Sequence, residues 1–273
     1  MSPAVAWQGG LTGRLRIGAS RLFAEPSAVA ALLADRPLLP PRINALAAAH
    51  ALPLACIGAD AGPSDTLEPL LDTAITTLCA AQPGNAHLLN ALRRMRDCFD
   101  LHCHLLQALE MRARLLMEVE RIGREAHARD RSIAGCIDRL AEHRAGPVFE
   151  LGRSTADDAP GMIERIRSGG CSAVAIRCWW CARNGDATVP APGHAAAIAA
   201  RQTGAAVLLV APPSALHPGT DRGEDIPLLP DSELLPAELI SALVTGSRAI
   251  APGCPTALDA VARSEICGLF SAL

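Results

Sequence analysis

The stretch CSAVAIRCWWCARNGDATVPAPGHAAAIAARQTGAAVLLVAP, residues 171–212, decides the fold. Its two apolar runs, 171–179 and 205–212, have the length of strands, and the alanine-rich segment between them, 192–204, ends on glycine. A strand, a helix closed by glycine and a fully buried second strand are typical of a parallel sheet with helices on its faces. We therefore expect α/β architecture in this part of the chain.

The same alternation continues in both directions from this stretch. Further strands are expected at 147–152, 226–230, 248–252 and 266–272, and further helices at 157–170, 236–246 and 255–264. Regular alternation of strands and helices predicts a Rossmann-like α/β domain with a parallel sheet, spanning residues 146–273.

A long helical region precedes this domain. Between Asn85 and His127 there is no proline and only one glycine. Side chains at alternating steps of four and three residues form a heptad seam, which predicts one helix of about 40 residues: Leu88, Leu92, Met95, Phe99, His102, Leu106, Leu109, Ala113 and Leu116. A second helix is expected at 132–143. We assign 84–145 to a helical hairpin or to a homodimer seam through residues 88–119, and residues 1–83 to a small mixed α/β region with a strand at 52–60.

Composition excludes several classes of function. The net charge is −3 and aromatic residues are 3% of the chain, so nucleic-acid binding is not expected. All 25 basic residues are arginine, so no lysine can anchor pyridoxal phosphate or complete a Walker-type loop. The sequence shows neither a membrane span nor a signal peptide, and we expect a cytoplasmic location. No cofactor is indicated.

Ligands of parallel α/β sheets bind beyond the carboxyl ends of the strands. This rule points to Arg177, Trp180 and Arg183 after one strand, to His194 at the start of the next helix, and to Gly253 and Thr256 after a later strand. Arginines and a helix N-terminus favour a phosphate-bearing ligand. The alternative is a solvated loop whose charges form structural ion pairs. No catalytic residue can be assigned.

Two groups of cysteines suggest thiol or metal chemistry as another possibility. Cys178 and Cys181 form a Cys-x-x-Cys, but a loop follows them instead of the helix that activates such a thiol. Cys98, His102, Cys103 and His104 form a second cluster, in which only the first two share a helix face. A zinc site needs four ligands, so no metal site is predicted.

Three segments of residues 147–273 resemble the C-terminal domain of heptosyltransferase-like GT-B glycosyltransferases: AVAIRCWWCARNG (173–185), HAAAIAARQTGAAVLLVAPP (194–213) and LLPAELISALVTGSRAIAPGCPTALDAVARSEICGLF (234–270). The resemblance implies a protein that binds a nucleotide-sugar or another phosphorylated small molecule for glycosyl transfer. Two alternatives remain open at this point. One is a non-enzymatic assembly or regulatory protein acting through the long helix, and the other is a thiol or metal protein.

Overall fold

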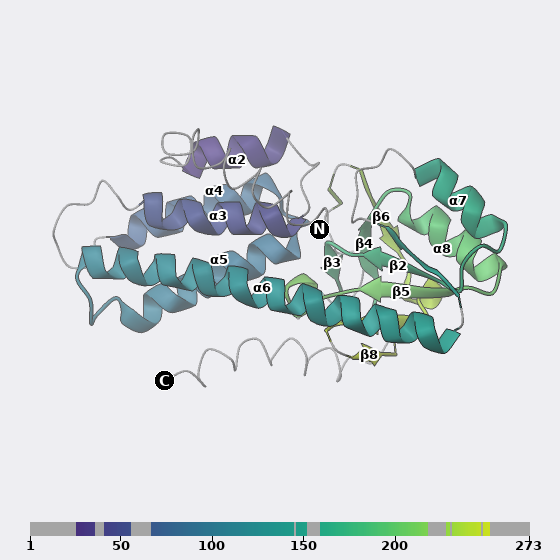
Figure 1. Ribbon diagram of the computed structural model, residues 1–273. Coiled ribbons are helices and arrows are strands. Elements are labelled where there is room, and N and C mark those ends of the chain that lie inside the picture. The colour runs from purple at the N-terminus through teal and green to yellow at the C-terminus, as the bar shows by residue number, and fades with distance from the viewer. Residues whose placement is uncertain are drawn as a thin grey trace.

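The computed structural model describes residues 26–35, 41–55, 67–144, 146–151, 159–217, 228–229, 231–246 and 248–251. A five-stranded sheet lies to one side of a group of helices, on the right in Figure 1. The strand order is β1 (Val148–Leu151), β2 (Ala173–Arg177), β5 (Ala206–Val210), β7 (Ala242–Val244) and β8 (Ala249–Ile250). The first four are parallel and β8 is antiparallel. The predicted α/β class, with a mainly parallel sheet after a helical region, is confirmed.

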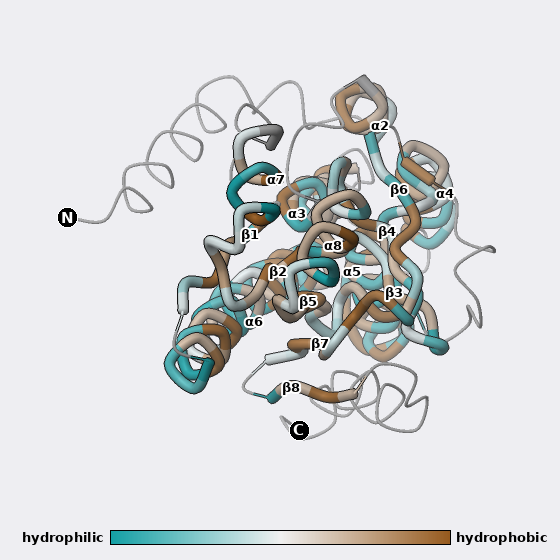
Figure 2. The backbone as a smooth tube through the Cα atoms, turned by 90° about the vertical axis from the view of Figure 1, so that its right-hand side faces the viewer, coloured by the Kyte–Doolittle hydropathy of each residue, from teal (hydrophilic) through white to brown (hydrophobic). Residues whose placement is uncertain are grey.

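Helices cover both faces of the sheet because its strands alternate between two buried cores. Val174 and Ile176 of β2 face the core beneath α7 (Ala159–Arg167) and α8 (Gly193–Gln202). Ala173 and Ala175 face the opposite core, which includes Ile133 of α6 (Ala108–Arg144). Figure 2 shows the sheet between α8 on one side and α6 on the other. Burial on both faces explains the nearly continuous apolar runs of β2 and β5.

The helical region packs around a separate core. It contains α2 (Pro26–Asp35), α3 (Pro41–Ala55), α4 (Glu68–Ala81), α5 (Ala86–His102) and the first half of α6. The strand expected at 52–60 is wrong as far as residue 55, which ends α3, and its remainder lies outside the described residues. Among the residues described, no helix combines the length and the apolarity needed to cross a membrane.

The predicted helix of about 40 residues is two helices instead. The chain leaves the helix after α5 and turns through 103–107, where Glu110 Oε2 accepts the Gln107 N–H at 3.0 Å before α6 continues. α6 then runs without interruption through the expected gap before 132–143, over 37 residues, or about 56 Å. It packs on α3 and α5 with its first half and on the sheet with its second. α5 and α6 thus lie side by side as a hairpin whose turn falls inside the expected long helix, and not between that helix and the one expected at 132–143. The assignment of 84–145 to a hairpin or a homodimer seam stays a prediction.

The helix predicted at 236–246 is also wrong. This segment forms a short 3-10 turn, Ala237–Leu239, followed by β7, which completes the parallel part of the sheet beside β5. A second, antiparallel sheet contains β3 (Trp180–Cys181), β4 (Ala187–Pro190) and β6 (Ser232–Leu235). Residues 228–229 are not part of a strand, and the elements expected at 255–264 and 266–272 lie outside the described residues. The domain limits at 83/84 and 145/146 stay predictions.

Candidate functional site at the rim of the sheet

The carboxyl ends of β1 and β2 meet the helical region at a cluster of four charged side chains. Arg177 ends β2, and its guanidinium lies 3.8 Å from Asp130 of α6 and 3.7 Å from Glu150 of β1. Asp130 also pairs with Arg42 of α3. Two arginines thus face two carboxylates, and the charge of the cluster is balanced. A phosphate at Arg177 would compete with both of its acidic partners.

The start of α8, where we predicted an anion, is bound by an acidic side chain of the protein itself. The His194 backbone N–H donates to Glu233 Oε1 of β6. A carboxylate satisfies an open helix N-terminus in the same way as a bound anion does. A ligand phosphate at His194 would therefore have to displace Glu233.

Trp180 lies in the wall between the sheet and the helical region. It is buried with Ala86 and Leu89 of α5, and its indole ring centre is 4.4 Å from the ring centre of His217. Arg183 is half-buried in the turn between β3 and β4. Both residues therefore belong to a hairpin that covers the carboxyl end of β2, instead of lining an open loop.

The four predicted ligand residues that the structure describes thus lie in different surroundings. Arg177 binds acids of α6 and β1, whereas the His194 N–H binds β6. Gly253 and Thr256 lie outside the described residues. Ligand binding through this set of residues stays a prediction.

The Cys-x-x-Cys is part of the core. Cys178 and Cys181 are buried free thiols, the first directly after β2 and the second within β3 of the hairpin. Burial raises the pKa of Cys181 to about 12, and burial together with the neighbouring Cys181 raises the pKa of Cys178 well above its usual value. Both thiols stay protonated at neutral pH, whereas a reactive cysteine needs a depressed pKa. Their strand-end position agrees with the interpretation favoured by the sequence.

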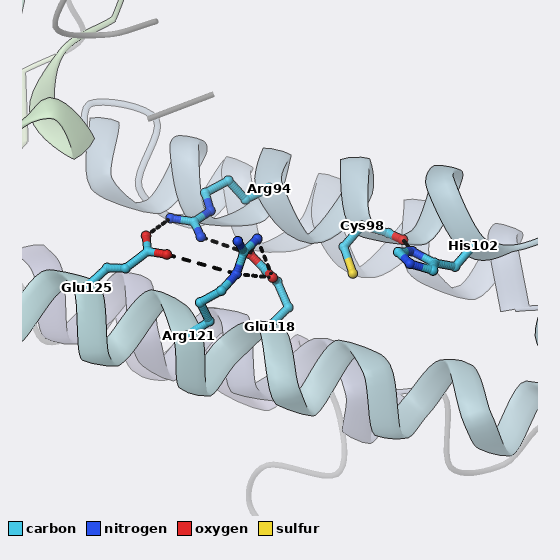
Figure 3. A network of polar contacts seen from close by, with 6 residues as sticks. All are labelled: Arg94, Cys98, His102, Glu118, Arg121 and Glu125. Atoms are coloured by element: carbon cyan, nitrogen blue, oxygen red, sulfur yellow. Dashed lines mark hydrogen bonds and ion pairs between the residues drawn. The ribbon is translucent and has the colours of Figure 1, made fainter. Parts of the chain in front are cut away.

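The second cluster, of Cys98, His102, Cys103 and His104, contains a structural hydrogen bond. His102 Nδ1 lies 2.8 Å from the carbonyl oxygen of Cys98 one turn before it (Figure 3). In the part of the chain that the structure describes, no group of three or more His, Cys, Asp or Glu side chains could bind a metal ion.

A buried charge network joins α5 to α6 near this cluster (Figure 3). The Glu118 carboxylate, with a side chain only 4% exposed, accepts from Arg94 at 2.9 Å and from Arg121 at 2.8 Å. Arg94 also donates to Glu125 at 2.8 Å. The network contains two carboxylates and two guanidinium groups, so its charges balance. The buried Glu118 carboxylate is therefore paired with opposite charge.

Sequence reasoning missed the residues that attach the helical region to the rim. His87 Nδ1 lies 2.9 Å from the Ser214 hydroxyl, and Nε2 lies 3.5 Å from the Cys178 carbonyl oxygen. Asn90 Nδ2 donates to the carbonyl oxygens of Ser214 and Leu216 at 2.8 and 2.9 Å. The only sequence signal was two polar residues, His87 and Asn90, on one face of a helix, and it names no partner.

We call the hydrogen bonds of His87 and Asn90 to the turn after β5 the latch. The surroundings of His87 keep its imidazole neutral. Burial lowers the pKa of His87 to about 4, the nearby Arg42 and Arg177 charges act in the same direction, and the Cys178 carbonyl and Asp130 oppose them. A neutral imidazole has one acceptor nitrogen and one donor N–H, so it can accept from a hydroxyl and donate to a carbonyl. The pair of His87 and Ser214 therefore fastens α5 to the turn that follows β5.

No protein-family model and no curated protein sequence matches the chain. Solved structures of eIF2B subunits share its fold. The match to eIF2B beta from Chaetomium thermophilum has a TM-score of 0.65 at 17% identity and covers 93% of this chain and 94% of that one. The match to the tetrameric eIF2B-beta2-delta2 complex from C. thermophilum has a TM-score of 0.69 at 17% identity, covering 93% and 97%.

An enzyme shares the eIF2B-like fold. The 5-methylthioribose 1-phosphate isomerase from Pyrococcus horikoshii matches with a TM-score of 0.65 at 15% identity, covering 88% of each chain. At these identities the comparisons establish the fold alone. They also overturn the resemblance to heptosyltransferase-like GT-B glycosyltransferases, and with it the glycosyl-transfer function and the nucleotide-sugar ligand. The error arose because strand–helix alternation is common to all sheets of this class.

Proposed function

We propose that this chain is a non-catalytic protein that acts by assembling with further copies of itself, as a regulatory or structural subunit with an eIF2B-like fold. The observation that carries the proposal is an apolar surface on the outward face of α6. Leu109 is 71% exposed, Met117 58% and Leu116 42%. Large apolar side chains gathered on one helix face mark an interaction surface.

The rim of the sheet supports a non-catalytic role. In the described residues, its reactive side chains include two buried thiols with raised pKa, a neutral buried histidine hydrogen-bonded to the Ser214 hydroxyl, and an arginine facing two acids. Networks of groups that are paired within the protein also perturb pKa values, so these shifts are compatible with a structural role.

The structural comparison supports assembly. A complex of eIF2B beta and delta chains described as tetrameric has the same fold over nearly the whole length of this chain. The proposal restricts the interface of the predicted homodimer to part of residues 88–119. Leu88, Leu92, Met95 and Phe99 are buried within the chain itself and are not available to a second copy. The large apolar side chains of this range that are exposed are Leu101, Leu105, Leu109, Leu116 and Met117, and most of them belong to α6. The expected cytoplasmic location remains part of the proposal.

A pair of variants with equal exposure tests this function. Leu116 on α6 and Leu70 on α4 are both 42% exposed. Leu116→Asp is expected to weaken self-association roughly 100-fold, because a charge replaces apolar burial worth about 1.5 kcal/mol in each of two copies. Leu70→Asp is expected to leave it unchanged. Size-exclusion chromatography with light scattering measures both, and equal masses for the two variants would argue against the proposal.

A further inference from the structure

Two buried polar atoms of the β3–β4 hairpin have no hydrogen-bond partner among the residues that the structure describes. They are the indole Nε1 of Trp180 and the hydroxyl oxygen of Thr188. Trp180 is 4% exposed and Thr188 is 1% exposed, so bulk water does not reach either group. Buried donors and acceptors in folded proteins are satisfied by the protein or by ordered water in nearly every case.

The two atoms lie on the same face of the hairpin. Trp180 and Thr188 are directly opposite each other in the antiparallel register of β3 and β4. Side chains in such positions point to the same side of a sheet, with Cβ atoms roughly 5 Å apart. The next pair along the ladder, Cys181 and Ala187, faces the core beneath α7 and α8 instead. Both unpaired atoms therefore belong to the other face of the hairpin.

This other face packs against α5, where the helical region meets the sheet (Figure 1). Trp180 is in one apolar cluster with Ala86 and Leu89 of α5. Ala182 belongs to the same cluster, and the His217 ring centre lies 4.4 Å from that of the indole. Each of the two alanines carries only a methyl group, so they leave more room beside the indole than larger side chains would.

The chemistry of the two groups fits a water molecule. An indole N–H can only donate a hydrogen bond, whereas a threonine hydroxyl can donate one and also accept. A water oxygen can accept from the indole while one of its hydrogens bonds to the hydroxyl oxygen. Buried waters bridge polar groups in this way, with two to four hydrogen bonds each. A metal cation does not fit, because the indole N–H offers it no lone pair.

We propose that the interface between α5 and the β3–β4 hairpin holds one ordered water molecule, which accepts from Trp180 Nε1 and bonds to the hydroxyl of Thr188. The water satisfies two polar groups that stand in an otherwise apolar cluster. The site is internal to one chain, so it is independent of the proposed self-assembly.

A crystal structure tests this site directly. The wild type is expected to show one water within roughly 2.5–3.2 Å of both Trp180 Nε1 and Thr188 Oγ1. Thr188→Val replaces the hydroxyl by a methyl group of similar shape and is expected to lose this water. Thr188→Ser keeps the hydroxyl, is the matched control and is expected to retain it. A wild type without this water, or a water that persists in Thr188→Val, would overturn the proposal.

Urea unfolding is an independent test, because the sign of the effect separates a bridged hydroxyl from an unpaired one. With the water bound, Thr188→Val leaves the water with one partner fewer, and the equilibrium constant of unfolding is expected to rise about fivefold. If the hydroxyl has no partner at all, valine removes a buried polar group and this constant falls. A constant that is unchanged or lower would therefore overturn the proposal, even without crystals of the variant.

Discussion

Replacing Arg94 by alanine is expected to lower the free energy of unfolding by about 3 kcal/mol, because it leaves a buried carboxylate with one partner fewer. Glu118 is 4% exposed and lies between Arg94 and Arg121 in the interface of α5 and α6 (Figure 3). Breaking such a pair by removing one member costs more than the pair contributes, since the remaining charge stays out of water. Equilibrium urea unfolding measures the effect.

An exposed pair on α6 is the control for this prediction. Arg124 lies 3.7 Å from Glu120, and both side chains are about 70% exposed. Because solvent-exposed pairs contribute little, Arg124→Ala is expected to change the free energy of unfolding by about 0.5 kcal/mol or less. Similar losses for Arg94→Ala and Arg124→Ala would contradict the idea that the Glu118 network stabilises the hairpin.

The latch at His87 makes stability depend on pH. The native state keeps this imidazole neutral, with a pKa of about 4, whereas the unfolded chain binds a proton near pH 6.5. Stability from this group is therefore fully present above about pH 6.5 and is lost as the pH falls towards 4. Between pH 7.5 and 5 the free energy of unfolding is expected to fall by about 2 kcal/mol from His87 alone.

Urea unfolding of His87→Gln isolates this contribution. Glutamine can donate and accept hydrogen bonds but does not titrate, so its free energy of unfolding is expected to fall about 2 kcal/mol less between pH 7.5 and 5 than that of the wild type. Other titrating groups contribute equally to both proteins. Identical pH dependence in the two would show that His87 binds its proton equally well in the native and the unfolded state, and would contradict a lowered native pKa.

The sheet was predictable because its strands and α8 satisfy local rules. β2, β5 and α8 fall within the segments expected at 171–179, 205–212 and 192–204. β7 was not predictable, because a three-residue apolar strand cannot be distinguished from a turn of helix by periodicity. Its place in the sheet depends on pairing with β5, more than 30 residues away.

The helical hairpin shows where a periodic pattern misleads. The predicted seam is correct in α5, where Leu88, Leu92, Met95 and Phe99 are buried. Beyond the turn at 103–107 the phase changes, so that Met111 and Leu115 turn inward while Leu109 and Leu116 are exposed. No proline or glycine marks that turn in the sequence. Of the predicted seam residues on α6, Leu109, Ala113 and Leu116 are therefore exposed instead of buried.

The candidate site depends on contacts that sequence reasoning could not see. Arg177 lies at the end of a strand, as expected, and the predicted ligand anion at the start of α8 stays a prediction because Glu233 accepts the N–H there. Sequence reasoning could not identify Asp130, Glu150 and Glu233 as the partners, because 47, 27 and 39 residues separate them from the groups they bind. The same is true of His87 and Ser214, which are 127 residues apart. Only the folded chain shows that the charges at the rim are paired internally.

Sedimentation equilibrium of the wild type over a wide concentration range measures self-assembly of the unmodified protein. With self-assembly, the mass is expected to rise to at least twice the 28.4 kDa of one chain. A single species of 28.4 kDa at every concentration would contradict it.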